Sequence, residues 1–201
     1  NLTIYGLNGY EHTITFTIIE STGEFENGGE YKGSVIISIP NATLKLDGNT
    51  FNSGTTVNVV GYHTLTVIGT NGYEQEYNFT IIPNVEFNVN GSIVNFEEGK
   101  SYENASYIKV KVSNVDYILL NGVAYSSNTY IYNFGNHTIL IYGTNGYVFE
   151  MNFTKEAIFS GIEEGKEYSS YTVISCNYAQ KLELNGTSFS NGSSLLTIGN
   201  H

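Results

Sequence analysis

The sequence predicts an all-β protein built of β-sandwich units in series, and three observations lead to this prediction. The chain has only two prolines and many β-branched and aromatic residues, a composition that favours strands. Apolar and polar residues alternate along several segments, as in strands with one buried face. Asn-Gly and Asp-Gly turn signals separate these segments at intervals of about 8–12 residues, the spacing typical of sandwiches.

Internal repetition defines the units. A strand-turn-strand block reads LTIYGLNGYEHTITFTI from Leu2, LTVIGTNGYEQEYNFTI from Leu65 and ILIYGTNGYVFEMNFTK from Ile139. A short acidic turn that ends in tyrosine occupies 25–31, 96–102 and 162–168, and a block with a central Asp-Gly or Asn-Gly begins at Leu44, Ile118 and Leu182. Because the blocks recur in one order, we expect repeated copies of one structural unit.

Alternation within the repeated strand block assigns its two faces. In the second copy, the apolar face carries Tyr73, Tyr77, Phe79 and Ile81, and the intervening positions are polar. This is the pattern of a sandwich strand with one face in the core and one in water. The strand block therefore supplies two core strands to each unit.

The repeat phase predicts four segments. Residues 1–19 match the last two strands of a unit, 20–82 and 83–155 match whole units, and 156–201 match a unit without its last two strands. The longer segment 83–155 includes an insertion around Asn90–Gly91 that predicts an extra hairpin. Reading from His201 back into Asn1 restores the repeat with no residue missing, so we expect one domain to be split between the two ends of the chain.

A split domain leaves an open core and an unpaired sheet edge, and an isolated hairpin is only marginally stable. Three arrangements would cover them. The next copy continues covalently in a longer array, or a neighbouring copy donates residues 1–19 by strand addition, or the hairpin folds back on its own chain. Self-closure requires three units in series to bend into a ring, so we favour the two linear arrangements. The predicted assembly residues are Leu2, Ile4, Tyr10, Ile14, Phe16 and Ile18.

The motifs of the three copies resemble a known family, the immunoglobulin-like repeats of large bacterial and archaeal surface proteins. The shared pattern is L-N-G-x-x-[F/Y]-x-x-G, then G-x-[H/Y]-T-L, an Asn-Gly turn, and an alternating strand that ends in F-T-I. The resemblance implies tandem immunoglobulin-like β-sandwiches that serve as stalks, adhesins or spacers. Many members have clustered carboxylates for calcium, whereas this chain has only two aspartates, Asp47 and Asp116.

Composition restricts the partners. A net charge of −11 with eight Lys plus Arg excludes a basic surface for nucleic acid or anionic membranes, and no apolar run is long enough to span a bilayer. Charged residues form 13% of the chain, about half the usual share. The polar surface must come from Asn, Ser, Thr and Tyr, as in many secreted proteins. One cysteine, Cys176, permits no internal disulfide. We predict an extracellular, cell-surface location.

We predict no catalytic residues, cofactor or metal site. His63, His137 and His201 occupy equivalent places, one per unit, so they are too far apart to share a metal and are expected to be structural. Cys176 aligns with Ile39 and Val112, as a buried apolar residue does. The acidic pairs at 97–98 and 163–164 lie in turns and are expected to be solvated.

Tyrosines and sequons are the remaining candidates. Six of the 17 tyrosines recur at fixed positions and are expected to be structural: Tyr10, Tyr31, Tyr73, Tyr102, Tyr147 and Tyr168. In the middle unit, Tyr107, Tyr117, Tyr125, Tyr130 and Tyr132 are less regular, and they are candidates for an aromatic platform that binds cell-surface or host glycans. Candidate N-glycosylation sites, from N-x-S/T sequons, are Asn41, Asn78, Asn90, Asn104, Asn152 and Asn185.

The predicted function is a structural unit of an extracellular filament, stalk or adhesin. Its partners are other copies of the same chain, assembled head to tail so that residues 1–19 complete the C-terminal domain of a neighbour. The alternative is an immunoglobulin-like accessory module of a secreted protein that binds carbohydrate or protein.

Overall fold

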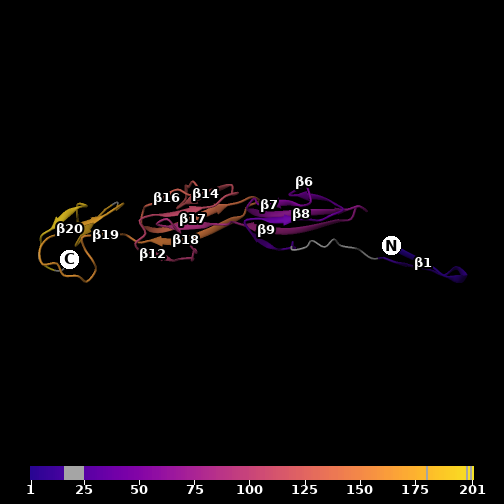
Figure 1. Ribbon diagram of the computed structural model, residues 1–201, viewed down its shortest axis with the longest axis horizontal. Helices are drawn as coiled ribbons and strands as arrows, with labels where there is room; N and C mark the ends of the chain where they lie inside the picture. Colours follow the sequence, from indigo (N-terminus) through magenta and orange to yellow (C-terminus); the bar gives the residue numbers. More distant parts are fainter. Residues whose placement is uncertain (16–24, 180, 198, 200) are drawn as a thin grey trace.

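The computed structural model describes residues 1–15, 25–179, 181–197, 199 and 201. Apart from one short 3-10 turn, every regular element in these residues is a β-strand. Two β-sandwiches lie one after the other, with a separate N-terminal hairpin at one end and a smaller group of C-terminal strands at the other (Figure 1). The prediction of an all-β chain is confirmed.

The N-terminal hairpin consists of β1 (Leu2–Tyr5), the 3-10 turn η1 (Leu7–Gly9) and β2 (Glu11–Ile14). Asn8 and Gly9 both adopt positive φ, which Asn and Gly tolerate best. The two strands pair with each other alone and form a separate two-stranded sheet.

The first sandwich packs a five-stranded sheet against a two-stranded one. The larger sheet has the order β3-β9-β8-β5-β6 and the smaller is β4-β7. The strands are β3 (Glu30–Lys32), β4 (Val35–Ile37), β5 (Ala42–Leu46), β6 (Asn49–Phe51), β7 (Thr55–Val57), β8 (Gly61–Gly69) and β9 (Glu74–Ile82). Strand β4 ends at Ile37, and beyond it the amide of Ile39 donates to the hydroxyl of Ser53 at 2.9 Å instead of to a neighbouring strand.

The second sandwich repeats this plan with a larger second sheet. Its five-stranded sheet has the order β12-β18-β17-β14-β15, and its four-stranded sheet has the order β11-β10-β13-β16. The strands are β10 (Glu86–Val89), β11 (Ser92–Val94), β12 (Ser101–Tyr102), β13 (Ile108–Lys111), β14 (Tyr117–Leu120), β15 (Val123–Ala124), β16 (Tyr130–Ile131), β17 (Gly135–Tyr142) and β18 (Val148–Lys155). β10 and β11 form a hairpin about Asn90–Gly91.

Each sandwich encloses its own apolar core, and these cores consist of the alternating positions of the repeated blocks. Phe25, Leu44, Leu65 and Phe79 are buried in the first core. The second core is centred on Phe87, which packs edge-on against Phe153 with ring centroids 5.1 Å apart. Two sheets face to face around alternating inward residues define an immunoglobulin-like sandwich.

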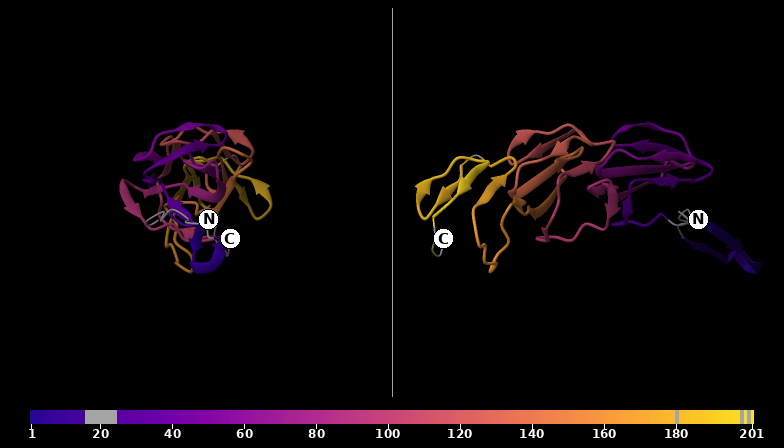
Figure 2. Two further views of the ribbon diagram at one scale, coloured as in Figure 1. Left: turned by 90° about the vertical axis from the view of Figure 1, so that its right-hand side faces the viewer. Right: turned by 60° about the vertical axis from the view of Figure 1, so that its left-hand side comes forward.

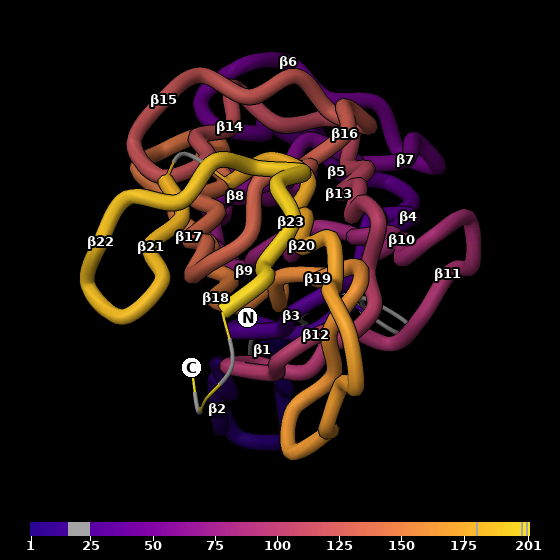
Figure 3. The backbone as a smooth tube through the Cα atoms, turned by 90° about the vertical axis from the view of Figure 1, so that its left-hand side faces the viewer, coloured from indigo at the N-terminus to yellow at the C-terminus, as the bar shows by residue number. Residues whose placement is uncertain are grey.

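The C-terminal strands form two small separate sheets. One contains β19 (Phe159–Ser160), β20 (Thr172–Cys176) and β23 (Ser193–Leu195), and the other contains β21 (Glu183–Leu184) and β22 (Thr187–Ser188). When the molecule is viewed along its long axis, β21 and β22 project to one side (Figure 3). Figure 2 shows this third group beside the second sandwich. It has fewer strands than either sandwich.

Candidate functional site

The N-terminal hairpin has the register of the central hairpin in each sandwich. Leu2 pairs with Ile14 in the hairpin, Leu65 with Tyr77 in the first sandwich and Ile139 with Met151 in the second. The turns close in the same way, because the amide at each first turn glycine donates to a tyrosine carbonyl: Gly6 to Tyr10, Gly69 to Tyr73 and Gly143 to Tyr147, at 2.8–3.0 Å. The hairpin therefore has the local structure of a core hairpin without a sandwich around it.

Exposure separates the hairpin from its two counterparts. Leu2 is 52% exposed, whereas Leu65 and Ile139 at the equivalent positions are both 0% exposed. Ile4 and Ile14 are also exposed, although the residues at their positions in both sandwiches are buried or half-buried. In folded proteins, an exposed apolar face of this kind is normally covered by other parts of the same chain or by a partner protein.

The C-terminal group lacks the strands that this hairpin matches. In each sandwich the central hairpin pairs with the strand before the Asp-Gly or Asn-Gly turn, as Leu46 with Leu65 and Leu120 with Ile139. The corresponding strand, β21, pairs only with β22 in the described residues. The described segment 161–171 also contains no strand equivalent to β3 or β12. One five-stranded sheet is thus reduced to its outer two strands.

The remaining core of this group is partly open. Ile174 and Cys176 are buried, yet Tyr168 is 46% exposed where its counterpart Tyr102 is 7% exposed. Tyr102 packs on Phe153 of a central hairpin with ring centroids 6.3 Å apart, and Tyr168 has no such ring contact among the described residues. The exposed ring lies where a central hairpin would cover it.

Local structure in the C-terminal group nevertheless matches the sandwiches. The amide of Cys176 donates to Asn191 Oδ1 at 2.9 Å, as the amides of Ile39 and Val112 donate to the hydroxyls of Ser53 and Ser127 at 2.9 Å. Cys176 is 1% exposed, and burial raises the pKa of its thiol. Its place agrees with the expected apolar role. The C-terminal group thus shares this local hydrogen bond with both sandwiches.

The predicted assembly residues divide by position. Leu2, Ile4 and Ile14 lie in β1 and β2, and Tyr10 follows the turn. Phe16 and Ile18 lie outside the described residues.

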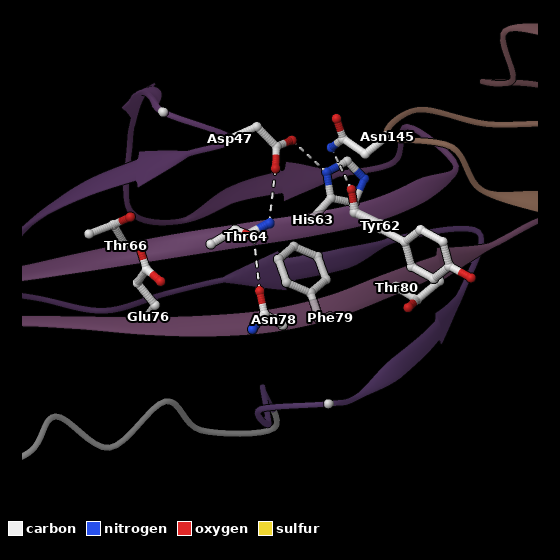
Figure 4. A pocket seen from close by; sticks show the side chains of 12 residues that line it. Asp47, Tyr62, His63, Thr64, Thr66, Glu76, Asn78, Phe79, Thr80 and Asn145 are labelled. Atoms are coloured by element: carbon white, nitrogen blue, oxygen red, sulfur yellow. Dashed lines mark hydrogen bonds and ion pairs between the residues drawn. The ribbon is translucent and has the colours of Figure 1, made fainter.

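A polar hollow on the first sandwich contains a carboxylate paired with an imidazole, two groups that can act in catalysis (Figure 4). Asp47 Oδ2 lies 2.8 Å from Nδ1 of the buried His63, and His63 Nε2 lies 2.8 Å from the carbonyl oxygen of Val59. Asp47 Oδ1 accepts from the amide of Thr64 at 2.9 Å. Both ring nitrogens are engaged by the protein, so neither is positioned to act on a substrate.

The same arrangement recurs in the other copies with asparagine in place of Asp47. His137 Nδ1 is 3.1 Å from Asn121 Nδ2, and His201 Nδ1 is 3.1 Å from Asn185 Nδ2. His137 Nε2 donates to the carbonyl of Asn133 at 2.9 Å. Burial lowers the pKa of His137, which agrees with a neutral ring that accepts the asparagine N–H. The histidines fix the turn before each central hairpin.

The middle-unit tyrosines separate into two kinds. Tyr125 is structural, since its hydroxyl donates to the carbonyl of Thr129 at 2.6 Å, and Tyr117 stacks on Tyr142 with centroids 4.3 Å apart. Four tyrosines instead form a row, which we call the tyrosine ladder. Ring contacts join its members in the order Tyr107, Tyr130, Tyr132 and Tyr178 at centroid distances of 4.9, 5.5 and 5.0 Å.

The ladder connects the second sandwich to the C-terminal group. Lys109 Nζ lies 5.1 Å from the centroid of the Tyr130 ring, a cation–π contact on the second sandwich. Tyr178 comes from the turn after β20, and sequence reasoning did not single it out. The sequence signal that could have identified Tyr178 is its alignment with Asn41 and Asn114 in the other copies. All three residues have positive φ.

The candidate glycosylation sites are mostly exposed turn residues. Positive φ occurs at Asn41, Asn90, Asn104 and Asn185. Asn78 is exposed on β9, and its side chain accepts from the hydroxyl of Thr64 at 2.9 Å. Asn152 is half-buried, and its amide group donates to Glu150 at 2.8 Å. Their modification stays a prediction.

The acidic pairs are exposed in the turns that the sequence indicated. Glu97 bonds to Lys100, Glu163 to Lys166, and Glu98 accepts from the amide of Asn152 at 3.2 Å. Within the described part of the chain, no group of three His, Cys, Asp or Glu residues could hold a metal ion. The same residues include no helix long and apolar enough to cross a membrane.

Comparison with known proteins gives similarity in structure alone. No family model matches the sequence, and no curated protein is found to be similar to it. Among solved structures, SGBP-B of a Bacteroides ovatus mixed-linkage glucan utilization locus, in complex with a mixed-linkage heptasaccharide, is 15% identical with a TM-score of 0.24. That match covers 90% of this chain, which spans 59% of the chain it matches.

Two other matches come from equally distant proteins. Fibronectin(III)-like modules of Clostridium thermocellum CbhA are 12% identical with a TM-score of 0.23, covering 68% of this chain and 93% of that chain. The N-terminal eight immunoglobulin domains of Down Syndrome Cell Adhesion Molecule are 13% identical with a TM-score of 0.23, covering 83% and 34%. These similarities are too low to carry any statement about function.

Proposed function

We propose that the chain is a structural unit of an extracellular filament, stalk or adhesin, in which residues 1–19 of one copy complete the C-terminal domain of a neighbouring copy. The proposed domains are 20–82, 83–155, and a third formed by 156–201 of one copy with 1–19 of the next. The assembly is linear and has one polarity, since each copy donates at one end and accepts at the other.

One observation carries this proposal. The hairpin 1–15 and the central hairpins β8–β9 and β17–β18 share register and turn, but only the first exposes its apolar face. In the described residues the C-terminal group has no such hairpin, and it exposes Tyr168, whose counterpart Tyr102 packs against one. Donor and acceptor are thus complementary in strand number, register and apolar surface, which is what strand addition requires.

The expected stabilisation is large. Full burial of a Leu or Ile side chain contributes about 1.5–3 kcal/mol. Leu2, Ile4 and Ile14 would all enter the core, and backbone pairing along β21 would add further hydrogen bonds. The hairpin backbone already has the register seen in the sandwiches. Little conformational entropy of the hairpin is therefore lost when it joins a neighbouring copy.

The proposed function is mechanical. Sandwiches in series set the length of a fibre, and packing with backbone pairing between copies resists extension along it. A single buried cysteine leaves no internal disulfide, so the described core must hold by packing. The charge of −11 keeps copies soluble and disfavours lateral contact without preventing apolar contacts at the ends.

The test is assembly of the purified chain, followed by light scattering and electron microscopy. We expect linear fibres from the wild type and monomers from the double variant Leu2→Ser with Ile14→Ser, because two core contacts are lost. Glu11→Ala is the matched control: it lies on the same hairpin at a position that is exposed in both sandwiches, and it should assemble normally. A compact monodisperse wild-type monomer would overturn the proposal.

Glycan binding at the tyrosine ladder is the second candidate function. The observation that favours it is the row of four rings, in which Tyr107 is half-buried and Tyr130, Tyr132 and Tyr178 are 48%, 39% and 54% exposed. Aromatic rings in a row are a surface on which sugar rings can pack. Carbohydrate would bind beside the junction between the second sandwich and the C-terminal group.

A glycan array tests this candidate directly. Binding that is lost in Tyr130→Ala and kept in Tyr117→Ala, which removes an exposed tyrosine outside the ladder, would favour it. Equal binding by both variants, or none by the wild type, would exclude the ladder as a glycan site.

A further inference from the structure

The contact between the two sandwiches is built from a turn and a loop. The loop comprises Val60–Tyr62, at the start of β8, and the turn comprises Gly143–Tyr147, between β17 and β18. Val60 donates its amide to the carbonyl of Asn114 and accepts from the amide of Thr144, each at 2.8 Å, and Asn145 Nδ2 donates to the carbonyl of Tyr62 at 2.7 Å. Residues 61 and 144 form a parallel β-bridge.

This contact is close enough to require glycine on both sides. A Cβ added at Gly143 would lie 2.3 Å from the carbonyl oxygen of Val60, and one added at Gly61 would lie 2.5 Å from the carbonyl oxygen of Thr144. Backbone atoms cannot move aside as a side-chain end can. The two glycines therefore allow backbone-to-backbone approach.

Apolar side chains seal the same contact. The ring of Tyr147 packs edge-on against Tyr62 with centroids 5.2 Å apart, and Tyr147 is 7% exposed. Val60 is buried beneath the turn. The turn of the second sandwich thus packs directly against the loop of the first.

Both halves of this contact recur, and within the described ranges neither recurrence is docked against the other kind of half. The loop recurs as Phe134–Asn136 at the start of β17, with glycine at 135 in positive φ and with residues 134 and 135 only half-buried. The turn recurs as Gly6–Tyr10, where Leu7 is 90% and Tyr10 is 60% exposed. Gly6 matches Gly143, and Gly135 matches Gly61, so the close approach is available to this pair also.

We propose that the turn Gly6–Tyr10 of one copy docks on the loop Phe134–Asn136 of a second copy. This inference rests on the proposed function and adds a second contact to it, outside the completed domain. By equivalence, the amide of Leu7 donates to the carbonyl of Phe134, the Asn8 side chain donates to the carbonyl of Asn136, and the Tyr10 ring covers Asn136, which replaces Tyr62.

The donated hairpin then spans two domains of the acceptor. Its strands complete the C-terminal domain and its turn contacts the second sandwich, as β17 and β18 do within one chain. The contact fixes the orientation of the completed domain relative to the second sandwich, so successive domains of the fibre meet through one kind of junction.

Crosslinking between two variants tests the docking. One copy carries Asn8→Cys and the other Asn136→Cys, both with Cys176→Val, the residue type of its counterpart Val112. The mixture is treated with a short bismaleimide, and light scattering measures assembly independently. Asn145→Cys with Tyr62→Cys in a single chain is the benchmark, because that pair occupies the equivalent contact, in which Asn145 Nδ2 donates to the carbonyl of Tyr62 at 2.7 Å.

We expect covalent dimers from the mixture, with a yield near that of the benchmark, and none from either variant alone. Fibres that form without crosslinks would overturn the docking and leave the proposed function standing. Absence of assembly in wild type and variants would overturn both.

Gly6→Ala provides a second test that introduces no cysteine. In the free hairpin its Cβ meets only the exposed Tyr10 side chain, at 3.0 Å, so the hairpin can form. In the docked state the same Cβ meets a backbone carbonyl, and we expect the association constant to fall at least tenfold. Glu11→Ala is again the control, and equal association by both variants would overturn the inference.

Discussion

The β1–β2 hairpin and the β17–β18 hairpin share register and turn but have opposite surroundings. In the second sandwich, Ile139 and Met151 are fully buried between sheets, whereas Leu2 and Ile14 at the same register are exposed. The turn of the first is open and that of the second is docked. Local sequence therefore determines the hairpin, and only the neighbouring strands determine whether its apolar face is covered.

The largest effect expected from this comparison is a difference between matched leucines. Leu65→Ala should lower the free energy of unfolding of the first sandwich by about 2–5 kcal/mol, since a fully buried side chain leaves a cavity. Leu2→Ala should leave the unfolding of both sandwiches unchanged and weaken assembly. Calorimetry at a concentration below assembly measures both. An equal loss in the two variants would contradict the comparison.

Gly143→Ala should break the contact between the two sandwiches. A Cβ 2.3 Å from the Val60 carbonyl forces the backbones apart, and overpacking of this kind costs about 1–3 kcal/mol. We expect Tyr147 to become exposed and the angle between sandwiches to vary, which small-angle scattering and tyrosine fluorescence report. The control is Ala124→Gly on the exposed strand β15, which should leave this contact intact. Gly122→Ala is not suitable as a control, because Gly122 has a positive φ.

Acid should destabilise the second sandwich through His137. Burial lowers the pKa of this histidine below its ordinary value of 6.5, so the fold favours the neutral ring. The resulting stabilisation is complete above about pH 6.5 and is lost progressively as the pH falls through the lower folded pKa. Thermal unfolding between pH 8 and about pH 4 measures it, with the exposed His12→Gln as control. Stability that rises on acidification over this range would contradict the assignment.

The smallest expected effect is that of Asp47→Asn. Asn121 makes the same two contacts in the second sandwich, one with His137 and one with the amide of Thr138 at 2.8 Å. An asparagine at 47 would donate to His63 Nδ1 and accept from Thr64, so we expect a change below about 1 kcal/mol. Chemical denaturation measures it, and a loss of several kcal/mol would indicate a role beyond fixing the turn.

Sequence reasoning reached the strands and their faces because alternation and turn residues are local signals. The expected structural histidines and the apolar place of Cys176 followed from alignment of the copies alone. It named Tyr107, Tyr130 and Tyr132 as platform candidates but missed Tyr178 of the tyrosine ladder, since Tyr178 and Tyr132 meet only when two units pack. It also missed the contact of Val60 with Thr144, although glycine recurs at 61, 135 and 199 and at 6, 69 and 143. Contacts between units depend on their relative placement, which no periodicity encodes.

Hydrogen–deuterium exchange of the full chain over a range of concentrations tests the central claim most directly. If residues 1–15 enter the C-terminal domain of another copy, amides of β1, β2 and β21 should become protected together as concentration rises, while β8 and β17 stay protected throughout. If β1 and β2 exchange rapidly at every concentration, including in any fibres that form, the hairpin is not the missing part of that domain.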